Sequence, residues 1–133
     1  MEQPKEFTII VSDHVFVLTR DQIHRDAPNY FTMFFEGPFK ESSEGVHALK
    51  LHRDPYLFTF IHMYLSGYEI LPLPRTDIPW HLSEGSRIKN LLLDARFYGL
   101  DSLAQELEAE INPESKSDVG DSRSAKGQKA WKL

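Results

Sequence analysis

The stretch after Arg53 constrains the fold most, because it predicts one amphipathic helix with a defined start and end. Asp54 can accept hydrogen bonds from the first free amides, and Pro55 suits the first helical position, where an N–H would have no partner. Apolar residues then recur at the spacing of one helical face: Leu57, Phe58, Ile61, Tyr64 and Leu65. Gly67 predicts the end of this helix. The apolar face of the helix predicts that the helix lies in the core.

Two short runs upstream of this helix are rich in β-branched and aromatic residues. They cover residues 7–11 and 15–18, and the polar residues between them predict a hairpin turn. Residues 46–51 predict another strand with one side packed inward. A small sheet is therefore expected beside the helix.

Helical signals also occur in four other segments: residues 19–25, 29–37, 86–98 and 101–112. Thr19 and Gln22 have the spacing of a capping box, and Asp101 can cap the last of these helices. Together the segments predict an α/β (α+β) fold, with a mixed sheet of about three strands flanked by about five helices.

The length of 133 residues fits one domain. We expect a short N-terminal segment over 1–6, a folded domain over 7–112 and a flexible basic tail over 113–133, where Ser, Lys, Asp and Gly dominate. The chain has no cysteine, which excludes disulfides and thiolate metal sites.

Charge is divided unevenly along the chain. Up to Asn112 there are 17 acids and 10 bases, whereas residues 113–133 hold 3 acids and 5 bases. An acidic folded part argues against direct nucleic-acid binding, which relies on clustered Lys and Arg. The sequence shows neither a secretory signal nor an apolar run of about 18 residues, so no membrane insertion is expected and a cytoplasmic or nuclear location is predicted.

Known catalytic and metal-binding patterns give no candidate site. His52-Arg53-Asp54 spells the catalytic tripeptide of protein kinases, but Thr59 stands where that loop needs Asn. The six histidines show no zinc-binding spacing. We therefore predict no catalytic residue, no metal and no cofactor; the most distant alternative is a small enzyme with an unrecognised site in a deep polar pocket.

Three stretches resemble segments of BTB/POZ domains. Residues 29–35, followed by Phe39-Lys40-Glu41-Ser42, are similar to the buried helix "S-x-Y-F-x-x-M-F" and the apolar-x-Glu-Ser loop after it. Residues 53–61 resemble the helix "R-D-P-x-x-F-x-x-I-L" of the branch that includes the tetramerisation domains of voltage-gated potassium channels. Residues 93–100 resemble the closing segment "L-x-E-A-x-F-Y-G-L" of that branch.

The resemblance implies a BTB/POZ fold and a protein-interaction function, through homo-oligomers or pairing with other BTB chains. In BTB proteins that recruit a cullin, an apolar residue of this loop fills a cullin pocket and the Glu contacts its rim, which implies Phe39 and Glu41 as cullin-binding residues. One hypothesis is therefore a substrate adaptor for a cullin-based ubiquitin ligase. The alternative is a purely structural BTB assembly or transcription-related scaffold, with Phe39 packed on its own core and Glu41 solvated.

The resemblance also implies which residues build the shared core of these three stretches: Tyr30, Phe31, Asp54, Phe58, Ala95, Phe97 and Tyr98. We expect them to condense into one core whose outer faces bind other chains.

Overall fold

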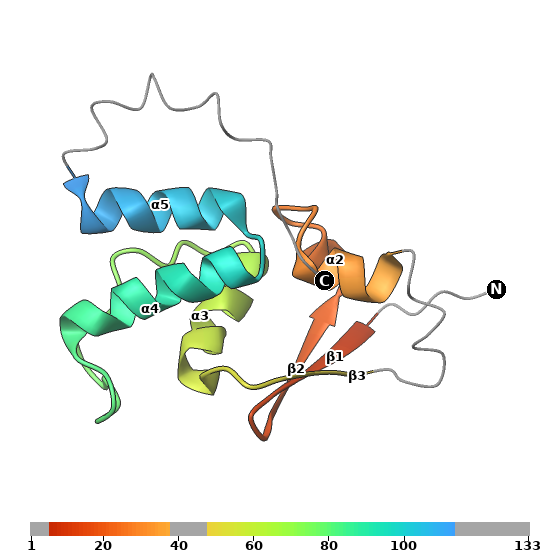
Figure 1. Cartoon of the computed structure of the whole chain (residues 1–133), viewed down its shortest axis with the longest axis horizontal. Helices are drawn as coiled ribbons and strands as arrows, with labels where there is room; N and C mark the ends of the chain where they lie inside the picture. Colours follow the sequence, from red (N-terminus) through yellow and green to blue (C-terminus); the bar gives the residue numbers. More distant parts are fainter. Residues whose placement is uncertain (1–5, 38–47, 114–133) are drawn as a thin grey trace.

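The fold is mixed α+β, with a three-stranded sheet and five helices within the described residues (Figure 1). The computed structural model describes residues 6–37 and 48–113. The elements in chain order are β1 (Glu6–Val11), β2 (His14–Thr19), α1 (Arg20–Ile23), α2 (Tyr30–Glu36), β3 (Ala48–Leu51), α3 (Pro55–Leu65), α4 (Glu84–Phe97) and α5 (Asp101–Ile111). The expected fold class, with its small sheet and about five helices, is therefore confirmed.

The sheet has the strand order β2-β1-β3. β1 and β2 form an antiparallel hairpin in which Val11 pairs with His14, so the turn consists of Ser12 and Asp13 alone. Both turn residues have positive φ, 44° and 81°, as a two-residue hairpin turn requires. β3 runs parallel to β1, from the pair Thr8 and Ala48 to the pair Val11 and Leu51.

The two faces of the sheet differ in burial. The inner face is buried against the helices through Phe7, Ile9, Val11, Leu18, Leu49 and Leu51. The register places the alternate residues on the opposite side, which we call the outer sheet face: Thr8, Ile10, Val15, Val17, Ala48 and Lys50. On this face Val15 is 64% exposed and Val17 is 43% exposed.

α3 is the central helix that the sequence predicts. The Asp54 Oδ1 atom accepts a hydrogen bond from the Tyr56 amide at 3.1 Å, and Pro55 occupies the first helical position. The buried residues of the helix are Leu57, Phe58, Phe60, Ile61 and Leu65. α3 stops at Leu65, and Gly67 follows with a φ of 95°.

α4 and α5 run side by side, at the far side of the molecule from the β1–β2 hairpin (Figure 1). Ser83 caps α4 by accepting a hydrogen bond from the Ser86 amide at 3.0 Å. The expectation that Asp101 caps α5 is wrong, because Asp101 is the first residue of that helix and Leu100 holds the cap position without a side-chain bond.

Candidate protein-interaction site

The three stretches that resemble BTB/POZ segments meet at one aromatic cluster, formed by Phe31, Phe58 and Tyr98. The ring of Phe31 stacks on Tyr98 with 5.1 Å between centroids. Phe58 meets Phe31 and Tyr98 edge-on, at 6.2 Å and 5.5 Å. All three side chains are fully buried, and the Tyr30 amide donates to the Tyr98 carbonyl at 2.8 Å. Residues from α2, α3 and the end of α4 therefore share one core, as does the buried Ala95.

A polar contact at the edge of this cluster links the segment before α3 to α4. Arg53 donates to the Asp94 carboxylate from Nη2 at 2.5 Å and from Nε at 3.2 Å. The Arg53 guanidinium also lies 4.2 Å from the ring centroid of Phe97. Burial raises the pKa of the Asp94 carboxyl, while the bond to Arg53 opposes this rise.

Phe97 lies at the surface, although the resemblance implies it as a core residue. Its side chain is 40% exposed, and Leu93, one helical turn earlier, is 55% exposed. Phe97 contacts the half-buried Tyr30 at 5.3 Å between centroids. The outer side of α4 thus combines exposed apolar surface with an aromatic side chain that its neighbours hold in place.

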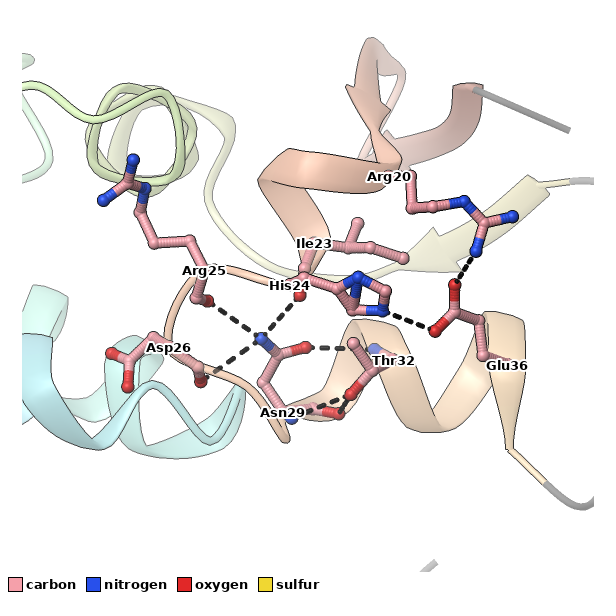
Figure 2. Close-up of polar contacts among 8 residues, drawn as sticks. All are labelled: Arg20, Ile23, His24, Arg25, Asp26, Asn29, Thr32 and Glu36. Atoms are coloured by element: carbon pink, nitrogen blue, oxygen red, sulfur yellow. Dashed lines mark hydrogen bonds and ion pairs between the residues drawn. The ribbon is translucent and has the colours of Figure 1, made fainter.

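Asn29 is a fully buried amide that joins α1, the following loop and α2 (Figure 2). Its Nδ2 donates to the carbonyl oxygens of Ile23, Arg25 and Asp26 at 2.9, 3.3 and 3.4 Å. The side-chain Oδ1 of Asn29 accepts a hydrogen bond from the Thr32 backbone amide at 3.0 Å, and the backbone amide of Asn29 donates to Thr32 Oγ1. The spacing from Asn29 to Thr32 is a capping signal, but it does not reveal the carbonyl contacts.

Glu36, near the end of α2, receives two contacts from α1 and its cap (Figure 2). Its carboxylate lies 2.8 Å from Arg20 Nη1 and 2.6 Å from His24 Nε2. These contacts join the end of α2 to α1. Phe39 and Glu41 belong to that stretch and lie outside the described residues, so the cullin contact stays a prediction.

Asp26 was not expected from sequence, yet it connects three elements. Its carboxylate accepts hydrogen bonds from the Ser102 amide at 3.1 Å, the Leu103 amide at 3.2 Å and the Tyr64 hydroxyl at 2.8 Å. Burial and the bond to Asp26 raise the pKa of the Tyr64 phenol above its ordinary value. Asp26 is thus the acceptor for the amides at the start of α5.

Glu106, on the exposed side of α5, gives a pH-dependent prediction. Burial raises the pKa of its carboxyl, and the nearby charges of Asp26 and Glu69 raise it further. An acid with a raised folded-state pKa is favourable below its unfolded pKa and costs stability as the pH rises through its folded pKa. Glu106→Gln should therefore stabilise the protein at about pH 7 by less than about 0.5 kcal/mol, and not at about pH 3.

Urea denaturation of the parent and the Glu106→Gln variant at both pH values would measure this difference. Glu110→Gln is the matched control, because it removes one negative charge from another exposed position of the same helix. A Glu106→Gln advantage that persists at low pH would contradict the electrostatic explanation.

Among residues 6–37 and 48–113, Arg87 Nε and Tyr98 Oη are buried polar atoms without a hydrogen-bond partner in that part of the chain. The Arg87 side chain is almost fully buried and donates from Nη1 to the Tyr56 hydroxyl at 3.1 Å. Burial raises the pKa of the Tyr98 phenol, so it stays protonated at neutral pH. Tyr98 therefore contributes to this region mainly through its ring.

Over residues 6–37 and 48–113, no three acidic, histidine or cysteine side chains are grouped closely enough to hold a metal ion. No helix in the same ranges is both long and apolar enough to cross a membrane. A comparison of the sequence with known protein families found no matching family, and a comparison with curated proteins found no similar sequence.

Proposed function

We propose that this chain is a protein-interaction domain of the BTB/POZ type that works by associating with further copies of itself. The single observation that carries the proposal is on the outer sheet face, where the apolar Val15 and Val17 are exposed although both belong to a regular strand. The shared aromatic core of the three BTB-like stretches supports the family assignment.

The energetics favour covering this surface. Full burial of a valine side chain contributes about 1.5–3 kcal/mol. Burying the exposed parts of Val15 and Val17 on each copy would therefore contribute a favourable free energy to association. Ile10 pairs with Val15 on the same face and is half-buried, which makes the apolar surface continuous across β1 and β2. A second copy presents the same surface, so one interface can satisfy both subunits.

Lysine at both Val15 and Val17 is expected to weaken self-association at least about tenfold, because each interface would then bury charged side chains. Sedimentation equilibrium or light scattering over a concentration series would measure the change. Tyr68→Lys is the matched control, since Tyr68 is also 64% exposed but lies outside the sheet. A parent protein that is monomeric at every concentration would refute self-association, and an unaffected lysine variant would exclude this surface.

The cullin contact of Phe39 and Glu41 is a separate prediction of the family resemblance. Self-association through β2 does not depend on it. Both the ligase adaptor and the purely structural assembly are consistent with an oligomeric domain.

A further inference from the structure

The outer sheet face carries one acid and one base in addition to its valines. Glu6 on β1 and Lys50 on β3 alternate with the buried residues of their strands, so both side chains face outward, and both are exposed. None of the ion pairs formed within residues 6–37 and 48–113 involves either side chain. The face therefore presents two charges of opposite sign that are not neutralised in that part of the chain.

These two charges lie at opposite corners of the face. The register places Glu6 beside Thr19 at one end of the sheet and Lys50 beside Ile10 toward the other end. Glu6 and Ile10 are four residues apart along β1, which is about 13 Å, and β3 lies about 4.8 Å to the side of β1. The structure accordingly forms no contact between the Glu6 and Lys50 side chains of one copy.

An acid and a base at opposite corners make the face complementary to itself. The two charges cancel, so neither a strongly anionic nor a strongly cationic partner is favoured. A second copy offers both charges in the required places. When a two-fold axis lies between two facing copies and crosses the strands near Thr8, the Glu6 corner of each copy meets the Lys50 corner of the other.

We propose that two copies pack with their outer sheet faces against each other, so that Glu6 of each copy pairs with Lys50 of the partner subunit. The inference rests on the proposed self-association and names the orientation of the two faces. Val17 lies in the same row of the sheet as Thr8, close to this axis, so it packs against the valines of the partner subunit. One interface thus covers the exposed valines and neutralises both charges.

Charge reversal tests this orientation. Glu6→Lys and Lys50→Glu each replace two attractive contacts in the dimer with two repulsive ones, so each variant alone should associate about tenfold more weakly than the parent. In a heterodimer of the two variants, both contacts again join opposite charges. An equimolar mixture of Glu6→Lys and Lys50→Glu should therefore associate about as strongly as the parent.

Sedimentation equilibrium over a concentration series up to about 1 mM measures each association, because a face of three short strands forms a weak interface. The matched controls are Glu110→Lys and Lys89→Glu, which make the same charge changes at exposed positions of α5 and α4. Alone and mixed, the two control variants should associate like the parent. Circular dichroism verifies that every variant is folded.

The outcomes separate this orientation from the proposed function. An oligomeric parent whose association neither Glu6→Lys nor Lys50→Glu changes would refute the pairing and leave self-association in another orientation. Weakening in both variants without recovery in their mixture would also overturn the pairing. A parent that is monomeric at every concentration would refute both proposals. Binding of a different protein to this face, without self-association, would assign the face to that protein instead.

Discussion

Replacing Asn29 with alanine is expected to lower the free energy of unfolding by about 3 kcal/mol. The Asn29 amide oxygen caps α2, and loss of such a cap costs about 1 kcal/mol. Its amide nitrogen is the shared donor for the carbonyls of Ile23, Arg25 and Asp26 (Figure 2). A buried carbonyl left without a donor costs a further amount of about 1–3 kcal/mol. Urea denaturation would measure the loss.

Two further variants at this position separate the cap from the carbonyl contacts. Asn29→Ser keeps an oxygen for the Thr32 amide but lacks the amide donor, so its loss should be smaller than that of alanine. Asn29→Asp keeps the shape and the cap but turns a carboxylate oxygen toward the three carbonyls. It should therefore be at least as unstable as alanine at neutral pH. An alanine variant as stable as the parent would show that these contacts contribute little.

The second large effect is expected for Asp26→Asn, which should destabilise the protein by about 2 kcal/mol. Asparagine also adopts the positive φ of 63° found at Asp26, so the backbone is preserved. The variant removes the negative charge at the start of α5 and leaves one acceptor oxygen for three donors, the amides of Ser102 and Leu103 and the hydroxyl of Tyr64. Thermal and urea unfolding would both report the change.

The chain contains a matched control for this substitution. Asp77 has a φ of 62° and is exposed, so Asp77→Asn makes the same chemical change in a similar backbone conformation. Its effect should stay within about 0.5 kcal/mol. A double-mutant cycle with Tyr64→Phe should show coupling between Tyr64 and Asp26. Equal losses for Asp26→Asn and Asp77→Asn would mean that the contacts to α5 are not stabilising.

Local signals predicted most of the elements. The capping box from Thr19 to Gln22 is present as expected, and Asp54 with Pro55 starts α3. Such caps depend on residues two or three positions apart, so they can be recognised in a sequence. The runs of β-branched and aromatic residues over 7–11 and 15–18 predicted the two strands of the hairpin, although the turn is one residue shorter than expected because His14 belongs to β2.

The start of α5 shows where local reasoning fails. Asp101 has the chemistry of a cap, but the acceptor for the α5 amides is Asp26, which precedes Ser102 by 76 positions. The contact requires the loop after α1 to lie against α5, and no periodicity or local motif encodes this placement. The same limit applies to Asn29. Its spacing to Thr32 can be recognised in the sequence as a capping signal, but its contacts with the three carbonyls cannot.

The sequence by itself determined the type and order of the elements, because hydrophobic spacing and local caps involve neighbouring residues only. Tertiary structure decided which polar groups share a site and which apolar residues remain exposed. Val15 and Leu18 both belong to a β-rich run, yet one is exposed and the other is buried. The two side chains lie on opposite faces of the sheet, and the packing of the helices against one face made that difference.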